Sequence, residues 1–464
     1  MPKPRTFARA ALAVLAAAAC LITRTDCSRR AGPPPMNIVI VCVNCLRKDG
    51  IGLYAGHGCT PHIDAFAEQG GIVFENLVCP ATWSDPCLYE LFTARDFRKD
   101  PDRAGKAFHE DVVIEDMTRR LPECLLSPRA TPGLGAGGYH RLWVYNRRLK
   151  RVPALAKVER LKPPFFLFVH ASTLHIPYAA TNFTADPAQV RLEDAPPEVR
   201  RHYADALRTV NQARQLRDKT VLSRIPFLVA AFGADLWEGT PLGQESRTVY
   251  GWMVNRRVLA TWRRSETYAA DIDLLRRLYQ ANVRTVDAEF ALLLESLEKR
   301  GLLDSTIVVV MGDHGEHLGQ HGCMEHWEPY DEIINPPLII RVPGRSGKVV
   351  IRDQVRTRDV LPTILDLAGV TLSEGATRGM DGRSLTSLLD GRGGGVTAFA
   401  RGQKPIHAIR RDDGWKMIWH LDTGRKEVYD LRSDPGETKN LVGARPHIQG
   451  HLRAELFRHA FGHE

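Results

Sequence analysis

The segment at residues 306–322, TIVVVMGDHGEHLGQHG, combines an apolar run with a polar turn. Residues 306–311 are apolar and mostly β-branched, which predicts a strand buried on both faces. The turn that follows carries Asp313 and His314 between glycines. Open α/β sheets bind ligands at the carboxyl ends of their strands, so this pair is a candidate site for a divalent metal or a charged ester. A polar loop in which Asp313 caps the next helix is the alternative.

Two further apolar runs predict buried strands. One is 37–43, NIVIVCV, which leads into Asn44 and Cys45. The other is 164–169, PFFLFV, which leads into His170. Each run therefore places polar or nucleophilic side chains directly after a strand, as the first segment does.

A long helix is predicted over 269–300, because its apolar residues recur at helical spacing. These apolar residues form one stripe along the helix, which is expected to be buried in the core. The helix leads into the strand at 306, as in a βαβ connection. Alternating residues near the C-terminal end predict a smaller antiparallel sheet with strands at 406–410, 415–420 and 427–431.

The composition indicates a globular protein with a mildly basic surface. Of 464 residues, 44% are hydrophobic and 25% are charged, which suits one large domain with a smaller one. The net charge of +9 is not concentrated in a run. It favours anionic substrates and gives no reason to expect a nucleic-acid partner.

Residues 1–30 predict a targeting segment. Basic residues precede an apolar run at 10–22, which is short for a membrane span, so a signal peptide is favoured. A retained N-terminal anchor and a lipid on Cys20 are the alternatives, and 31–35 is expected to be a linker. We expect an exported protein that is periplasmic, extracellular or membrane-anchored, with membrane contact only through such an anchor.

Ser84 stands at the start of a predicted helix that contains Pro86 in its first turn. Backbone N–H groups and the helix dipole favour an anion at that position, so Ser84 is a candidate nucleophile or anion-site residue. The alternative is that Ser84 is a plain helix N-cap.

In chain order, several motifs resemble those of the sulfatase family, within the alkaline phosphatase superfamily. Residues 37–49 resemble its opening strand, acidic metal site and Leu-Arg-x-Asp, and TPHID at 60–64 resembles Thr-Pro-Asn-Ile-Asp. Residues 84–94 resemble the nucleophile motif, Cys or Ser-x-Pro-Ser-Arg, followed by Leu-Phe-Thr-Gly. GDHGE at 312–316 resembles the Ser-Asp-His/Asn-Gly-Glu metal loop.

The resemblance implies an α/β fold. An alkaline-phosphatase-like mixed sheet sandwiched by helices is expected over 36–375, as the catalytic domain. A smaller antiparallel α+β subdomain is expected over 376–464.

The resemblance also implies a role for each matching residue. A divalent metal, usually Ca²⁺, would be held by a set consisting of Asn44, Cys45, Ser84, Asp313 and His314. Ser84 would also be the catalytic nucleophile after conversion to formylglycine. The substrate would be a small-molecule or glycan sulfate ester.

Two histidines complete the implied catalytic set. His175 lies in LHIPY, which resembles Pro-His-x-Pro-Tyr, where the imidazole reaches the ester group. Packing of His175 under a Pro-Tyr turn is the alternative. His326 stands where the family's His-Gly-x-x-x-Lys has its lysine, and it is predicted to be catalytic.

The chain departs from the family pattern at three positions. Asn44 and Cys45 replace two carboxylates, and Leu88 replaces the arginine of the nucleophile motif. Cysteine is a soft ligand that suits calcium poorly, so weaker binding of a hard cation is expected. The pair Cys42 and Cys45 straddles a strand end, which argues against a zinc site formed by that pair.

Three functions are therefore compatible with the sequence. The first is a metal-dependent hydrolase of sulfate esters with an altered site. The second is a phosphoryl hydrolase or transferase of the same superfamily that uses unmodified Ser84. The third is a non-catalytic relative that kept the fold.

Overall fold

The computed structural model describes residues 36–99, 140–146, 161–176, 178, 227, 230–231, 256–370, 374–403 and 405–462. The predicted targeting segment at 1–30 and the linker at 31–35 lie outside these residues. None of the helices in the described ranges is both long enough and apolar enough to cross a membrane.

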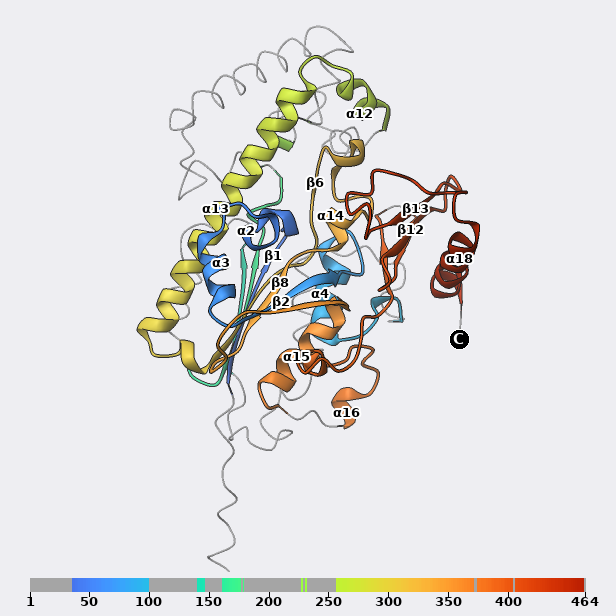
Figure 1. Ribbon diagram of the computed structural model, residues 1–464. Helices are drawn as coiled ribbons and strands as arrows, with labels where there is room; N and C mark the ends of the chain where they lie inside the picture. The colour runs from blue at the N-terminus through green and yellow to red at the C-terminus, as the bar shows by residue number, and fades with distance from the viewer. Residues whose placement is uncertain are drawn as a thin grey trace, which may run out of the picture.

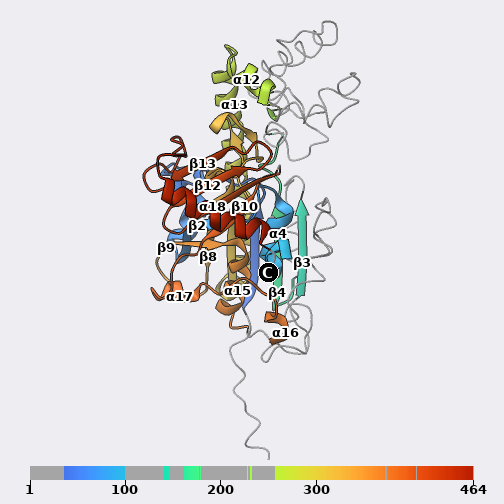
Figure 2. The same cartoon turned by 90° about the vertical axis from the view of Figure 1, so that its right-hand side faces the viewer.

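A mixed sheet of seven strands forms the centre of the molecule (Figures 1 and 2). Its order is β3-β4-β1-β5-β8-β2-β9, and only β8 runs antiparallel to its neighbours. The strands are β1 (Asn37–Val43), β2 (Gly71–Val78), β3 (His140–Asn146), β4 (Phe165–Ala171), β5 (Thr306–Gly312), β8 (Leu338–Arg341) and β9 (Val349–Arg356). The strands predicted at 37–43, 164–169 and 306–311 are thus confirmed, with small shifts at their ends.

Three neighbouring strands, β4, β1 and β5, end level with one another. Val43, the last residue of β1, pairs with Ala171 at the end of β4 and with Gly312 at the end of β5. All residues of these strands are buried, as their continuous apolar character predicts. The polar residues that follow β1 and β5 therefore meet at one edge of the sheet.

Helices cover both faces of the sheet (Figure 1). On one face, α3 (Pro61–Glu68) and the long α13 (Tyr268–Lys299) pack on the side chains of Val39 and Val41. On the other, α4 (Ser84–Thr93) and α15 (Val360–Leu367) pack on Ile38, Ile40 and Cys42. Cys42 belongs to the buried cluster on one face of the sheet and Cys45 to the cluster on the other.

A second, antiparallel sheet follows near the C-terminal end. It contains β10 (Ala398–Arg401), β11 (Ile406–Arg410), β12 (Trp415–His420) and β13 (Lys426–Asp430) in sequential order. One face packs on α18 (Pro446–Phe461). The other packs on α14 (Asp331–Ile334) and on the residues between β2 and α4, which brings this sheet beside the edge of the large one.

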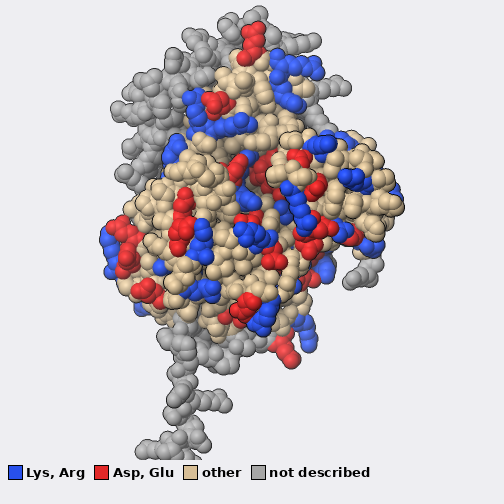
Figure 3. Space-filling view, viewed as in Figure 1, with Lys and Arg blue, Asp and Glu red and all other residues tan. Residues whose placement is uncertain are grey.

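The remaining described elements are short, apart from α12. They are η1 (Lys48–Gly50), α2 (Gly52–Ala55), η2 (Phe97–Lys99), α12 (Arg256–Arg263), η8 (Leu303–Ser305), β6 (His317–Leu318), η9 (Gln320–Gly322), β7 (Met324–Glu325), η10 (Thr357–Asp359), α16 (Glu374–Thr377) and α17 (Thr386–Leu389). Charged residues of both signs are interspersed over the face seen in Figure 3. This agrees with the absence of a charge run in the sequence.

Candidate active site

The loops after β1 and β5 and the start of α4 meet at the carboxyl edge of the sheet. Asp313 follows β5 and is 1% exposed. Its Oδ1 accepts hydrogen bonds from the backbone N–H groups of Cys45 (3.3 Å) and His314 (2.8 Å). Its Oδ2 lies 3.2 Å from Nε2 of His170, which belongs to β4. Burial opposes the charge of Asp313, but the His314 and His170 rings hold its pKa well below the usual range.

His314 presents one ring nitrogen to Ser84. Its Nδ1 lies 2.9 Å from the carbonyl oxygen of Gly315, so Nδ1 carries the proton and donates it. The lone pair is then on Nε2, which is 3.4 Å from Oγ of Ser84. Burial lowers the pKa of His314 to about 4, so the ring is neutral at neutral pH. Gly315 permits the tight turn, because a Cβ there would lie 1.8 Å from the carbonyl oxygen of Glu332.

Ser84 is the first residue of α4 and is almost completely buried. Trp83 occupies the N-cap position, and no side chain caps the helix. The alternative interpretation of Ser84 as an N-cap is therefore wrong. The Ser84 hydroxyl instead lies beside His314. It is also at the N-terminal end of a ten-residue helix, a position that favours an anion.

His326 and His175 complete a cluster of imidazoles. The His326 ring centroid lies 4.6 Å from that of His314 and 5.6 Å from that of His175. Nδ1 of His326 is 3.5 Å from Oε2 of Glu316, which is fully buried. Burial opposes protonation of His326, but Glu316 raises its pKa above the usual value. Nδ1 of His175 lies 3.0 Å from the carbonyl oxygen of Ile176, and its ring is only partly buried.

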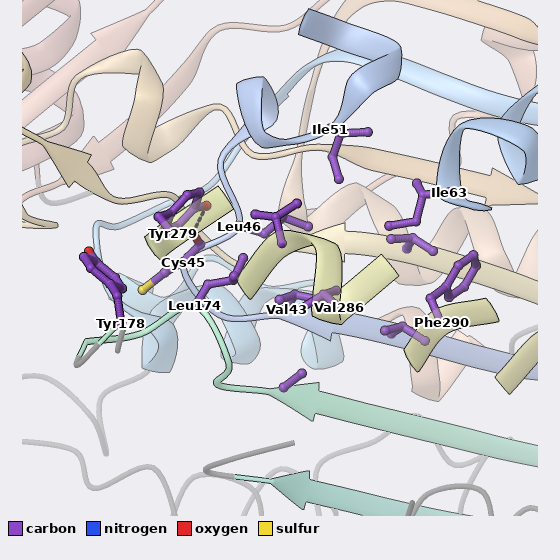
Figure 4. Packing of buried hydrophobic residues seen from close by; sticks show 14 of the residues in the cluster. Val43, Cys45, Leu46, Ile51, Ile63, Leu174, Tyr178, Tyr279, Val286 and Phe290 are labelled. Atoms are coloured by element: carbon purple, nitrogen blue, oxygen red, sulfur yellow. Dashed lines mark hydrogen bonds between the residues drawn. The ribbon is translucent and has the colours of Figure 1, made fainter. Parts of the chain in front are cut away.

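Cys45 is held in an unusual backbone conformation at the same edge. Its φ is +62°, which is uncommon for a residue with a Cβ. The Tyr279 hydroxyl donates to its carbonyl oxygen at 2.7 Å, and Figure 4 shows the sulfur projecting away from that bond, toward Tyr178. The thiol lies 3.2 Å from Oδ1 of Asn44. The ligand atoms of Cys45, His314 and His326 all lie within 4.8 Å of one another.

These donors do not fit calcium. Ca²⁺ takes six to eight oxygen ligands. Both oxygens of Asp313 already face N–H donors, and Oδ1 of Asn44 faces a thiol. The atoms that converge are one sulfur and two imidazole nitrogens. We therefore assign no chemical step to a calcium ion here.

Two family models match the chain. The Sulfatase model matches residues 149–370, and the model described as N-sulphoglucosamine sulphohydrolase, C-terminal, matches residues 319–460. The first includes the Asp313–His314 turn and the second extends through the small sheet.

The predicted resemblance to the sulfatase family is thus confirmed, and the two models together match residues 149–460. The expected fold is also confirmed: a mixed sheet between helices, with a small antiparallel sheet, forms an alkaline-phosphatase-like fold. The Sulfatase match begins at residue 149, so Ser84 lies outside it.

Similar proteins are sulfatases by name. The chain is 25% identical over 444 residues to a Delta 4,5-hexuronate-2-O-sulfatase of Bacteroides thetaiotaomicron, covering 88% of the chain and 84% of that protein. It is 26% identical over 199 residues to an arylsulfatase of Clostridium perfringens, covering 40% of each. The chain thus spans less than half the length of the latter relative.

A solved structure supports the fold. The protein crystallised with its substrate D-glucosamine-2-N,6-O-disulfate superposes with a TM-score of 0.60 at 20% identity. The match covers 91% of this chain and 97% of that one.

The structure brings together every residue predicted for the site, and it adds two. Asn44, Cys45, Ser84, Asp313 and His314 lie at the same edge with His326, and His175 lies against His326. The roles predicted for them stay predictions. Sequence analysis gave no role to His170, although it ends a buried strand, nor to Glu316, although it belongs to the quoted GDHGE motif.

Proposed function

We propose that the chain hydrolyses sulfate esters, small-molecule or glycan, at the site built around Ser84. The match to the Sulfatase model and the relatives named as a hexuronate sulfatase and an arylsulfatase support this activity. The observation that carries the proposal is the 3.4 Å approach of Ser84 Oγ to His314 Nε2 at the start of α4. It places a candidate nucleophile, a proton acceptor and an anion-favouring helix end together.

The reaction forms one bond to sulfur and breaks another. The oxygen at position 84 attacks the sulfur atom and passes its proton to Nε2 of His314, and the bond between sulfur and the alcohol oxygen breaks. The departing oxygen takes a proton, which His326 or His175 supplies. The raised pKa of His326, due to Glu316 acting against burial, favours the protonated ring that this step needs. Sulfate then leaves residue 84, water supplies the oxygen needed to restore the side chain, and the hydrolysis is complete.

The form of the nucleophile separates two versions of this activity. In the sulfatase version, Ser84 is converted to formylglycine before it acts. Leu88, in place of arginine, is buried in the core between α4 and the sheet and offers no polar group to that site. The neutral His314 ring beside an unmodified serine favours a second candidate, a phosphoryl hydrolase or transferase that forms an ester on Ser84.

Two further parts of the proposal concern metal and location. A divalent metal would stabilise negative charge on the ester oxygens, as metals do in hydrolysis of charged esters. Export remains our proposal for location, because the apolar run at 10–22 has the length of a signal peptide.

Peptide mass spectrometry of the chain from its native host tests the nucleophile. Formylglycine makes the Ser84 peptide lighter by two hydrogen atoms, and such protein should cleave a nitrophenyl sulfate. An intact serine together with a phosphoserine trapped on nitrophenyl phosphate would select the second candidate. An intact serine with no turnover of either ester, in folded and metal-loaded protein, would overturn both.

Ser84→Ala is the matched variant for this test. We expect complete loss of ester turnover. The free energy of unfolding should change by less than about 1 kcal/mol, because the side chain caps no helix. Ser433→Ala, at an exposed turn, is the control that should keep both activity and stability. Retained activity in Ser84→Ala, measured with both esters, would remove Ser84 from the mechanism.

A further inference from the structure

The atoms that converge beside Ser84 are soft and borderline ligands. We propose that Cys45, His314 and His326 form a binding site for a borderline transition metal, Zn²⁺ above all, in place of calcium. This inference concerns the ion and its ligands, and it does not depend on which ester the protein cleaves.

The spacing of the three side chains suits zinc. Zinc binds thiolate at about 2.3 Å and imidazole at about 2.0–2.1 Å, so tetrahedral ligands lie about 3.5 Å apart. The ligand atoms of the three residues lie within 4.8 Å of one another before any ion draws them together. Small side-chain rotations are enough to close that difference.

Both histidines are oriented as metal ligands usually are. A metal-binding imidazole typically donates its other N–H to a carbonyl or a carboxylate, which fixes its tautomer. Nδ1 of His314 meets the Gly315 carbonyl at 2.9 Å, and Nδ1 of His326 meets the Glu316 carboxylate at 3.5 Å. In each ring, Nε2 is left as the ligand atom.

Glu316 supplies an independent indication of a bound cation. It is fully buried, and the groups that face its carboxylate are His326, His175 and Cys45, two of which belong to the proposed ligand set. A buried carboxylate is costly unless a charge compensates it. His326 at 3.5 Å compensates it in part, and a metal ion on the far side of that ring would complete the compensation.

Cys45 has a strained backbone conformation that two hydrogen bonds hold in place. Its left-handed backbone is fixed by Tyr279 at the carbonyl oxygen and by Asp313 at the N–H. Such strained residues cluster at functional sites, because something must hold them. Here the two bonds aim a buried sulfur at the pair of imidazoles.

Three protein ligands leave one position of a tetrahedral site open, as in catalytic zinc sites. Ser84 Oγ lies 3.4 Å from Nε2 of His314, so a metal ion held by these residues would lie near Ser84. With Nε2 of His326 on a metal ion, the remaining proton on its Nδ1 would face Glu316, so His175 would be the residue that protonates the leaving oxygen.

Cobalt loading of the purified full chain tests the ligand set. Co²⁺ replaces Zn²⁺ in such sites and reports a thiolate ligand by charge-transfer absorption in the near ultraviolet. We expect this band in the unmodified chain at one cobalt per molecule. Zinc should displace the cobalt, and an excess of calcium should not.

Two variants separate Cys45 from the other thiols. Cys45→Ser should lose the charge-transfer band, and Cys323→Ser, a partly buried cysteine outside the three-residue set, should keep it. Glu316→Gln should weaken zinc binding by about 10-fold, because it removes the negative charge that faces His326. Retention of the band in Cys45→Ser, or its loss in Cys323→Ser, would overturn the assignment.

X-ray absorption of the zinc-loaded unmodified chain decides the question even if a variant fails to fold. One zinc–sulfur distance of about 2.3 Å is expected, with nitrogen ligands at about 2.0 Å. Oxygen-only coordination, or stoichiometric calcium with no zinc bound, would refute the proposal. An inactive protein that binds zinc through sulfur would uphold it while contradicting the proposed ester hydrolysis, so the two failures are distinguishable.

Discussion

The side chains of Asn44 and Cys45 determine which kind of metal ion the site can bind. Both are buried, and neither carries the negative charge that a hard cation needs. Asp tolerates a left-handed backbone better than most residues, so the φ of +62° at position 45 does not forbid a carboxylate there. The identity of these two residues therefore decides which ion the site prefers.

The double change Asn44→Asp with Cys45→Asp should move that preference from zinc to calcium. Binding to the native state alone is stabilising, by about 2.7 kcal/mol when the ligand is at 100 times its Kd. We expect calcium to raise the melting temperature of the double variant and to leave that of the unmodified chain unchanged. Thermal denaturation with and without each ion measures this, and a variant that responds only to zinc would contradict it.

The long helix α13 also stabilises the start of a neighbouring helix. Asp287 accepts hydrogen bonds from the N–H groups of Ile63 (2.8 Å) and His62 (3.3 Å), at the N-terminal end of α3. Thr60, at the N-cap position, provides no side-chain cap. A residue 225 positions away in sequence thus replaces the local cap.

Asp287→Ala should lower the free energy of unfolding by about 1–2 kcal/mol, as loss of a helix cap does. Asp273→Ala removes an exposed carboxylate from the same helix and should cost less than about 1 kcal/mol. Urea unfolding of both variants measures the difference. Equal effects would mean that Asp287 does not cap α3.

The docking of α18 should depend on pH through His459. Its ring stacks on Phe399 with centroids 3.4 Å apart, and its Nδ1 lies 3.1 Å from Nη2 of Arg98. Burial and Arg98 lower the pKa of His459 to about 3. The folded state thus keeps the ring neutral, while the unfolded chain takes up a proton near pH 6.5. Stability is therefore lost as the pH falls from about 6.5 toward 3.

His459→Phe keeps an aromatic ring against Phe399 but removes this titration. We expect its stability to fall less steeply than that of the unmodified chain over that pH range. His451→Phe, on the exposed side of the same helix, should leave the slope unchanged. Denaturant unfolding at several pH values tests this, and parallel slopes for all three proteins would exclude His459 as the cause.

At the scale of the whole molecule, a buried lysine links the small sheet to α14. Lys416 of β12 is completely buried, and its Nζ lies 2.9 Å from Oδ1 of Asp331 in α14 and 2.8 Å from Oε1 of Glu437. α14 follows the loop that carries His326, so this ion pair also fixes the small sheet beside the site. A buried charge is tolerated here because two carboxylates compensate it.

Lys416→Met should destabilise the protein by about 3–5 kcal/mol, because it leaves Glu437 buried without its cationic partner, although Asp331 keeps its ion pair with Arg410. Lys439→Met, at an exposed position, should change stability by less than about 0.5 kcal/mol. Chemical denaturation gives both values. A loss below about 1 kcal/mol in Lys416→Met would show that the small sheet docks on α14 without this pair.

The sequence alone determined the elements and the edge at which the site lies. Apolar runs at 37–43 and 306–311 define buried strands, and the residue types that follow each run mark its polar end. These features are local, because the period of a strand or helix and the residue that ends it are set within a few positions. Motif order then sufficed to predict the family and the fold.

Only the tertiary structure decided which side chains meet. Ser84 and His314 are separated by 230 positions, and no local pattern indicates that their polar atoms lie 3.4 Å apart. The same holds for Cys45 with His326, and for Lys416 with Asp331. Such contacts depend on strand order, on level strand ends and on how helices pack across the sheet. The ligand chemistry at this edge therefore follows from the assembled fold, where sulfur and imidazole converge and the carboxylate of Asp313 is already engaged.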